Sequence, residues 1–227
     1  IKVIYKVVDI KIIMHDVVTK LVLIQKEIQQ KNNQTKIIAV SKTFPIDKIM
    51  PLINHGHKDF GENKVQEAIE KWTAIKKKFT DINLHMVGKI QSNKVKYVIP
   101  LFDYIHSLDS LKLAEKISNE QKNYDKDIKI FIQVNIGDEP QKSGISPIEI
   151  EDFKNKCIYD LKLNIIGLMC LPPKNKNASI YFNEMNELLI KSGLKKLSMG
   201  MSQDYLEAIE HNASFIRVGS KIFGIRD

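Results

Sequence analysis

Arginine is nearly absent from this chain, and its scarcity limits what the net charge can mean. Of the 35 lysines and arginines in the 227 residues, only Arg217 and Arg226 are arginines. Asp and Glu number 27, so the formal net charge is +8. Recognition of phosphates and bases favours the forked guanidinium group, and the lysines here are scattered, with the densest run at Lys76–Lys78. The composition therefore disfavours a dedicated nucleic-acid surface.

Cysteine and long apolar runs are also scarce. Cys157 and Cys170 are the only cysteines, too few for a disulfide scaffold in a chain of this size, and unpaired cysteines suit a reducing compartment. The longest apolar runs, such as Leu21–Ile24, are far shorter than the roughly 18–20 residues that cross a bilayer. We therefore expect a cytoplasmic protein that has no membrane partner. The chain begins with Ile1 rather than Met, which leaves open a preceding organellar targeting segment.

Apolar residues are present in ample number, at 43% of the chain, and their spacing predicts the secondary structure. Apolar positions three and four residues apart predict an amphipathic helix over about 9–31. From residue 36 onward, short β-branched apolar runs alternate with helical patterns. The predicted strands are 36–41, 58–60, 83–87, 104–106, 129–135, 164–169, 196–199 and 215–218. The predicted helices between them are 47–55, 62–78, 92–99, 110–123, 147–159, 179–192 and 203–211.

This alternation predicts an α/β fold, a single (β/α)8 TIM-type barrel with an additional N-terminal helix. We expect one domain over 1–227, with the leading helix within 1–35 and the barrel over 36–227. No helix is predicted after the last strand, and the leading helix would fill that gap in the outer ring. Glycines 61, 88, 137, 200 and 219 stand at or just after the carboxyl ends of predicted strands, where such barrels carry their active sites. An open doubly wound sheet is the alternative.

Lys42 is the first candidate for chemistry. It closes the apolar run Ile37–Ser41, so its side chain would enter the mouth of the barrel. Burial there lowers the pKa of an amine and frees it as a nucleophile for Schiff-base formation. A lysine at a strand end can equally extend to water, and 33 lysines make a chance placement common.

A second group of candidates suits an anion. Ser202 is predicted as the N-cap of the helix after the seventh strand, where its hydroxyl and free backbone amides face a ligand. Arg217 lies inside an apolar strand, and Gly219 and Ser220 follow it. Strands one, seven and eight are neighbours in a closed barrel, so these residues would face Lys42. A lysine opposite a phosphate cradle suits an aldehyde cofactor with a phosphate tail, pyridoxal 5′-phosphate.

Several stretches, in order along nearly the whole chain, are similar to one family. The sequence resembles the YggS-type pyridoxal phosphate homeostasis proteins, which are relatives of the barrel domain of alanine racemase. The matching stretches are Ala39–Thr43, Phe60–Glu67, His85–Lys94, Gln133–Ile136 with Lys142–Gly144, Gly167–Met169, Leu197–Asp204 and Arg217–Gly224. Each stretch alone is weak evidence, but together, in order and at the family's spacing, they are specific.

The resemblance implies a role for each matching residue. Lys42 would form the Schiff base with pyridoxal 5′-phosphate. Ser202, Gly219, Ser220 and the backbone of Met201 would hold its phosphate, Arg217 would approach the pyridine nitrogen, and Asn63 would line the ring edge. Lys142 would be an accessory residue near the mouth that takes part in cofactor transfer. The sequence departs from the family at Phe44, where the family often has a second lysine, at Ile90, where it often has Leu, and at Ser220, where it often has Thr.

Other polar residues carry less information. His55 and His57 flank Gly56 at a predicted helix end, where we expect them on the surface. His85 lies in a predicted strand and suits a hydrogen-bonded core position. The six histidines and two cysteines never occur at metal-ligand spacing, so no metal site is expected.

Four functions remain to be weighed. The resemblance favours a monomeric carrier and regulator of pyridoxal phosphate in intracellular vitamin B6 homeostasis, without turnover of its own, which would meet apo pyridoxal phosphate enzymes transiently. The main alternative is a pyridoxal phosphate-dependent racemase or decarboxylase of amino acids, so whether the protein is an enzyme stays open. A Schiff-base aldolase uses the same lysine-plus-phosphate logic, and the +8 charge leaves an RNA-binding module as the fourth.

Overall fold

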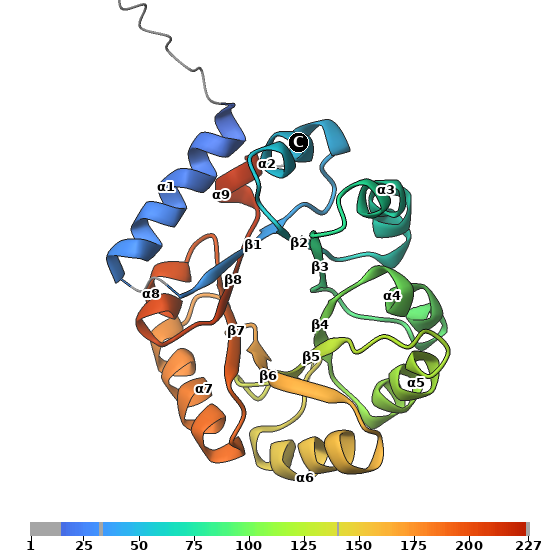
Figure 1. Ribbon diagram of the computed structural model, residues 1–227. Coiled ribbons are helices and arrows are strands. Elements are labelled where there is room, and N and C mark those ends of the chain that lie inside the picture. The colour runs from blue at the N-terminus through green and yellow to red at the C-terminus, as the bar shows by residue number, and fades with distance from the viewer. Residues whose placement is uncertain (1–14, 32–33, 140, 226–227) are drawn as a thin grey trace, which may run out of the picture.

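Eight parallel strands close into a barrel that is surrounded by helices (Figure 1), in a computed structural model that describes residues 15–31, 34–139 and 141–225. The strands are β1 Lys36–Val40, β2 Asp59–Glu62, β3 Asn83–Met86, β4 Tyr104–Leu108, β5 Lys129–Val134, β6 Asn164–Cys170, β7 Lys196–Met201 and β8 Phe215–Val218. All eight predicted strands are confirmed, and the predicted (β/α)8 barrel is the observed fold rather than an open sheet.

Helices connect the strands on the outside of the barrel. The α-helices are α1 Asp16–Lys31, α2 Ile46–Asn54, α3 Val65–Lys78, α4 Val95–Leu101, α5 Leu111–Gln121, α6 Ile150–Asn155, α7 Ala178–Ser192, α8 Tyr205–Glu210 and α9 Ser220–Phe223. Two 3-10 turns, η1 Ser92–Lys94 and η2 Pro147–Glu149, precede α4 and α6, and the π-helical turn η3 Lys156–Asp160 follows α6. The predicted helix over 147–159 is therefore three short helical segments of different hydrogen-bond period.

The barrel closes between β1 and β8. The two strands pair in parallel, with Ile38 opposite Arg217 and Ala39 opposite Val218. β8 also pairs with β7, and β1 pairs with β2. Because all strands run the same way, the loops after β1, β7 and β8 meet at one end of the barrel.

The prediction of no helix after the last strand is wrong. The short helix α9 follows β8 directly, and its Ile222 and Phe223 are buried. Four residues are about one helical turn, too few for an apolar period to appear in the sequence.

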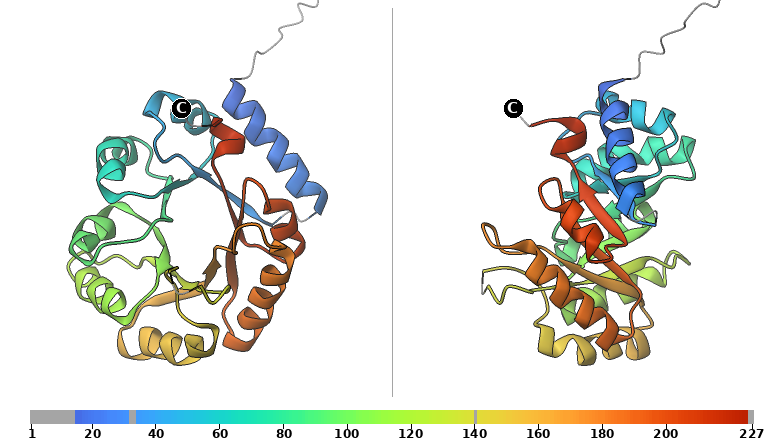
Figure 2. Two further views of the ribbon diagram at one scale, coloured as in Figure 1. Left: turned by 180° about the vertical axis from the view of Figure 1, so that it is seen from behind. Right: turned by 90° about the vertical axis from the view of Figure 1, so that its left-hand side faces the viewer.

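The leading helix occupies the predicted gap in the outer ring. Helix α1 contacts α2, α8 and α9, and the two opposite views in Figure 1 and Figure 2 agree on this placement. Val17, Leu21, Ile24 and Ile28 form its buried face. The first part of the predicted helix, 9–14, lies outside the described residues. Within the ranges that the structure describes, no helix is long and apolar enough to cross a membrane.

Two apolar layers hold the barrel together. The larger lies between strands and helices, and Trp72, Phe60 and Phe182 are among its fully buried side chains. A smaller cluster around Phe131 and Phe215 lies among the strands. The right-hand view of Figure 2 shows the barrel from the side, with the loop after β6 projecting beyond the carboxyl ends of the strands. These carboxyl ends carry the candidate site.

Candidate functional site

A cavity of about 400 Å³ opens at the carboxyl ends of β1, β7 and β8. Its volume falls in the range of about 300–1,000 Å³ that small-molecule sites occupy. Seven of the predicted site residues line it: Lys42, Asn63, Met201, Ser202, Arg217, Gly219 and Ser220. Five lining residues were not predicted as ligands: Val40, Val87, Leu171, Gln203 and Asp204. The tertiary fold thus brings together residues that are up to 180 positions apart in the chain.

Lys42 lies half-buried in the first residues after β1. The strand end before it is anchored to β2, because the Ser41 amide donates to the Gly61 carbonyl at 2.9 Å. The Ser41 hydroxyl also donates to Glu62 Oε1 at 2.8 Å. These bonds hold the backbone of the lysine against the neighbouring strand.

A buried ion pair supports the loop that carries Lys42. Lys71 Nζ lies 2.8 Å from Glu62 Oε1, and the two side chains are 12% and 0% exposed. The same ammonium group donates to the carbonyls of Ser41 at 2.9 Å and Phe44 at 3.2 Å. It also pairs with Glu67 at 2.8 Å, and Glu67 accepts a bond from the Thr43 amide. Lys71 therefore spans both sides of Lys42.

Sequence reasoning missed the roles of Lys71 and Glu62. The spacing of four residues between Glu67 and Lys71 in the sequence is typical of an ion pair on a helix. Nothing local showed that Glu62 would be buried, or that it would accept from Trp72 Nε1 at 3.0 Å as well as from Lys71.

The hydroxyl side of the cavity comes from the loops after β7 and β8. Ser202 Oγ accepts a bond from the Lys221 amide at 3.4 Å, which ties these two loops together. The prediction that Ser202 caps the next helix is wrong. Helix α8 begins at Tyr205 with Asp204 as its N-cap residue, and Asp204 Oδ1 accepts from the Met201 amide at 2.6 Å. The carboxylate closes the turn and leaves the Ser202 side chain in the cavity lining.

Asn63 is positioned by a close backbone approach. A Cβ atom on Gly88 would lie 2.2 Å from the carbonyl oxygen of Asn63. Only glycine permits this contact between the loops after β2 and β3. Gly88 therefore sets the depth at which Asn63 lines the cavity.

Arg217 is a buried cation at the base of the cavity. It is 6% exposed and comes from β8. Its guanidinium donates to Ser198 Oγ at 2.7 Å and to the Cys170 carbonyl at 2.8 Å. Burial lowers its pKa, and burial also raises the pKa of the neighbouring Cys170 thiol to about 12. These two hydrogen bonds go to neutral oxygens, and the Asp204 carboxylate in the same lining opposes the lowering of the Arg217 pKa.

A chain of hydrogen bonds runs from Arg217 through the interior of the barrel. The Ser198 hydroxyl lies 2.8 Å from His106 Nδ1, and His106 Nε2 lies 3.0 Å from His85 Nδ1. His85 Nε2 in turn lies 3.0 Å from Asp59 Oδ1. His85, His106 and Ser198 are fully buried. The expectation of a hydrogen-bonded core position for His85 is confirmed.

The donor and acceptor capacities of these groups assign the protons along this chain of hydrogen bonds when both imidazoles are neutral. The Asp59 carboxylate only accepts, so a neutral His85 donates from Nε2 and accepts at Nδ1. A neutral His106 that donates from Nε2 accepts at Nδ1 from the Ser198 hydroxyl, and Ser198 itself accepts from Arg217. His106 then donates from Nε2 to His85, which donates from its Nε2 to the carboxylate of Asp59. Both imidazoles are neutral in this arrangement. Burial lowers the pKa of His85 despite Asp59, and burial with the charge of Arg217 holds the pKa of His106 well below its ordinary value.

The buried histidines predict an acid-sensitive fold. Their pKa is lower in the folded than in the unfolded chain, so the unfolded state binds more protons as the pH falls below about 6.5. We expect the free energy of unfolding to fall by up to about 1.4 kcal/mol per pH unit for each such histidine. His106→Gln keeps one donor and one acceptor and removes one titration. Urea unfolding between pH 5 and 8 should show a shallower acid slope for this variant and equal slopes above pH 7.5. Equal slopes between pH 5 and 6.5 would contradict this account.

The remaining predicted residues lie elsewhere. Lys142 is not in the lining of this cavity, and it pairs with Glu139 and donates to the Pro172 carbonyl at 3.3 Å.

Phe44 is buried and stacks on Phe223 with ring centroids 5.1 Å apart, so an apolar contact occupies the position of the family's second lysine. His55 is exposed, but His57 is half-buried and its Nε2 lies 2.9 Å from the Asp59 carbonyl, so its surface placement was wrong.

Metal ligands do not gather in the described ranges. Among residues 15–31, 34–139 and 141–225, no three His, Cys, Asp or Glu side chains are arranged to hold a metal ion.

Comparison with known proteins adds to this geometry. Residues 23–227 match the family model of the alanine racemase N-terminal domain. A pyridoxal phosphate homeostasis protein from Pasteurella multocida is 34% identical over 217 residues, which cover 90% of this chain and 93% of that protein. A protein of the same name from Aquifex aeolicus is 38% identical, over 86% of this chain and 88% of its own. The chain belongs to the pyridoxal phosphate homeostasis protein family.

Solved structures of similar proteins share this fold. PipY of Synechococcus elongatus without PLP matches with a TM-score of 0.83 at 32% identity, over 92% of this chain and all of PipY. PipY with PLP bound matches with a TM-score of 0.81 at 30% identity and the same coverage. Alanine racemase from Corynebacterium glutamicum shares the fold at 17% identity and a TM-score of 0.66, and the chain covers 61% of that enzyme.

Proposed function

We propose that this protein binds pyridoxal 5′-phosphate in the cavity at the carboxyl ends of the strands and acts in intracellular vitamin B6 homeostasis. The observation that carries the proposal is the meeting of Lys42, Arg217 and the hydroxyls of Ser202 and Ser220 in one cavity. An amine, a buried cation and two hydroxyls suit the aldehyde, the pyridine nitrogen and the phosphate of this cofactor. The names of the relatives and the PLP-bound PipY structure support the same assignment.

Each residue has a distinct task in this proposal. The Lys42 amine adds to the cofactor aldehyde, a carbon–nitrogen double bond forms, and one water leaves. Ser202, Ser220 and the backbone at Gly219 and Met201 hold the phosphate. The Met201 amide already donates to Asp204, so its contribution requires this turn to open, because the carbonyl and the side chain of Met201 have no donor for a phosphate.

The two remaining residues act on the ring. Arg217 donates toward the pyridine nitrogen, so that this nitrogen stays unprotonated and the ring is a weak electron sink. Asn63 lines the ring edge. A weak electron sink suits a carrier better than a catalyst, which is why we place the protein in cofactor handling without turnover.

An amino-acid racemase or decarboxylase is the second candidate, because alanine racemases share the barrel. A racemase needs proton donors and acceptors on both faces of the ring. Among the described residues that line the cavity, none is tyrosine or histidine. Turnover of D- and L-amino acids by the loaded protein, lost in Lys42→Ala, would favour the enzyme.

Three finer points belong to the same proposal. We place the protein in the cytoplasm as a monomer, and we propose that it meets apo pyridoxal phosphate enzymes transiently to deliver its cofactor. Lys142 is proposed as an accessory residue in this transfer, from a position outside the cavity lining.

Chemical trapping tests the proposed function. Pyridoxal 5′-phosphate is added to the purified protein, the product is reduced with borohydride, and peptides are analysed by mass spectrometry. We expect one modified lysine, Lys42, at close to one equivalent. Modification spread evenly over surface lysines would show that the cavity does not bind the cofactor.

A further inference from the structure

A second cavity, of about 480 Å³, opens at the opposite end of the barrel. It is lined by the amino ends of β1, β4, β5, β6, β7 and β8 and by the segment before β7. We name it the N-terminal mouth. In (β/α)8 barrels this end usually serves stability, and the candidate site lies at the other end. A preformed cavity of this size therefore calls for a separate explanation.

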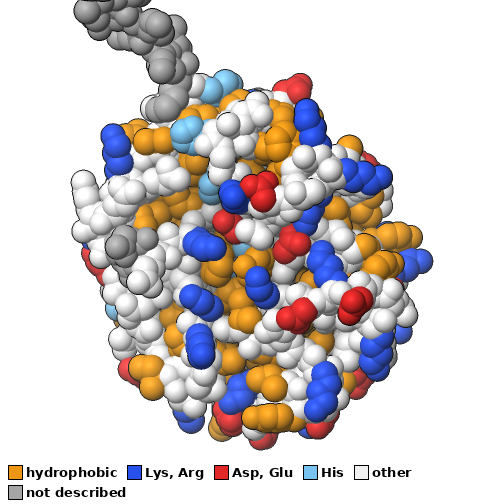
Figure 3. All heavy atoms as spheres, in the orientation of Figure 1, with side chains coloured by type: hydrophobic (Ala, Val, Ile, Leu, Met, Phe, Trp, Pro, Cys, Tyr) orange, Lys and Arg blue, Asp and Glu red, His pale blue; other side chains and the backbone are white. Residues whose placement is uncertain are grey.

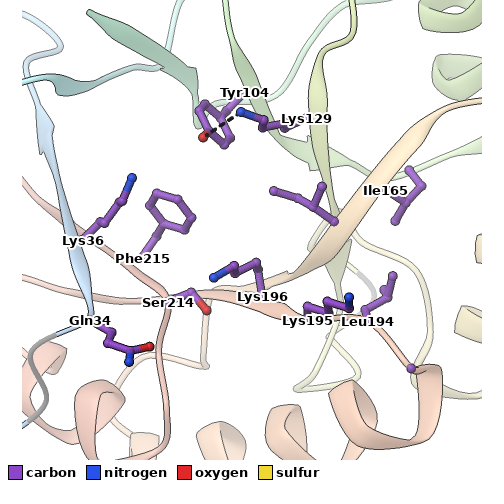
Figure 4. A pocket seen from close by; sticks show the side chains of 12 residues that line it. Gln34, Lys36, Tyr104, Lys129, Ile165, Leu194, Lys195, Lys196, Ser214 and Phe215 are labelled. Atoms are coloured by element: carbon purple, nitrogen blue, oxygen red, sulfur yellow. Dashed lines mark hydrogen bonds between the residues drawn. The ribbon is translucent and has the colours of Figure 1, made fainter.

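Basic side chains gather around the N-terminal mouth. Lys36, Lys129, Lys195 and Lys196 line it, and all four are exposed. Figure 4 shows Lys36, Lys129 and Lys196 extending from three strands toward a common space beside the Phe215 ring. Figure 3 shows the same face, where basic groups, with acidic groups among them, lie around an apolar patch over the middle of the barrel.

These lysines differ in their surroundings from the lysines that form salt bridges. Ten other lysines form salt bridges within the described residues, whereas none of the four around the N-terminal mouth does. Lys129 instead lies over the Tyr104 ring, with Nζ 3.4 Å from the hydroxyl. The half-buried Asp59 carboxylate interacts with Lys36 at longer range, since the charge of Lys36 contributes to the lowered pKa of Asp59. Four like charges that converge leave a net positive potential in a concave, low-dielectric space.

The walls beneath the lysines are apolar and rigid. Tyr104 and Phe215 are buried, with ring centroids 5.7 Å apart, and Tyr104 stacks on His85 at 4.2 Å. Ile166 from β6 packs against these rings, and Ile165 lines the cavity from the other side of the strand. The rings are fixed by the buried histidine chain behind them, so the surface is ready for a flat apolar group.

We propose that the N-terminal mouth binds a small organic anion that has a flat apolar body and a phosphate or sulfate-like head. The body lies against Tyr104, Phe215 and the isoleucines, and the ammonium groups of Lys36, Lys129 and Lys196 surround the head. A nucleic acid is less suited, because the apolar floor lies inside a cavity that a phosphate backbone would not fill. This site is independent of the cofactor cavity.

Binding of 2-naphthyl phosphate tests the site. The probe is titrated into methyl-labelled wild-type protein and followed by NMR, with isothermal calorimetry for the affinity. We expect saturable shifts of the Ile165 and Ile166 methyl groups at probe concentrations that leave Val40 and Val87 of the cofactor cavity unchanged. Shifts confined to Val40 and Val87 would overturn the proposal, as would tighter binding of 2-naphthol than of its phosphate ester.

Charge variants test the role of the lysines. Lys36→Met/Lys129→Met/Lys196→Met keeps the aliphatic stems and should weaken binding by about tenfold or more. The matched control Lys112→Met/Lys116→Met/Lys176→Met removes the same charge from exposed positions elsewhere and should stay within about twofold of wild type. Equal weakening in both variants would overturn the proposal. So would an RNA oligonucleotide that shifts Ile165 and Ile166 at lower concentration than the probe.

Discussion

Lys42→Ala is expected to abolish the visible absorbance that pyridoxal 5′-phosphate gives when it is bound through a Schiff base. The cavity offers one lysine of the proposed set at the end of β1, and Phe44 fills the place of a second. Without the Lys42 amine the cofactor has only the hydroxyls, the backbone and Arg217 to hold it. Absorbance spectra before and after gel filtration, with borohydride trapping, measure the loss.

Lys64→Ala is the matched control for this variant. Lys64 is exposed and lies just before α3, close in sequence to Asn63. We expect its spectrum to equal that of the wild-type protein. Full retention of the absorbance and of the trapped cofactor in Lys42→Ala would contradict the proposed function. Loss in both variants would show that unfolding, rather than chemistry, is measured, and thermal unfolding of each protein checks this directly.

Lys71→Met is expected to cause the largest loss of stability, about 3–5 kcal/mol in the free energy of unfolding. Glu62 is fully buried, and its Oε2 has no hydrogen-bond partner among the described residues. Without Lys71, the Oε1 atom of Glu62 accepts hydrogen bonds from Ser41 and Trp72 alone. The carbonyls of Ser41 and Phe44 also lose their donor, so the loop that carries Lys42 loosens.

Urea unfolding at pH 7 measures this cost. The double variant Glu62→Gln/Lys71→Met removes the orphaned charge and should recover more than half of the lost free energy. Lys20→Met breaks an exposed pair with Asp16, whose side chains are 38% and 70% exposed, and should cost about 0.5 kcal/mol or less. A cost for Lys71→Met as small as that for Lys20→Met would contradict the structural role of the ion pair.

The fold was predictable because its signals are local and repeated. Most strands are short apolar runs, although β2 has only Phe60 as a large apolar residue, and each long helix shows an apolar period. The misses occurred where the local signal is short. α9 has four residues, and the turn after β7 has both Ser202 and Asp204 as possible caps. The structure selects Asp204 because its carboxylate reaches the Met201 amide.

The candidate site was predictable in its residues but not in its support. Lys42, Ser202 and Ser220 follow strand ends and Arg217 lies near the end of β8, and the order of parallel strands in a closed barrel places such ends together. The Glu62–Lys71 pair depends on which face of β2 and α3 is buried, which no spacing in the sequence states.

By itself the sequence determined the alternation of strands and helices, the strand ends that bear the amine, the cation and the hydroxyls, and the resemblance to the family. These features follow from residue order alone. Only the tertiary structure decided that Arg217 ends a buried line of Ser198, His106, His85 and Asp59, and that four lysines without salt bridges surround an apolar floor at the far mouth. Such groupings arise because barrel closure brings side chains of distant strands into one interior, where burial and the need for hydrogen-bond partners determine their protonation and charge.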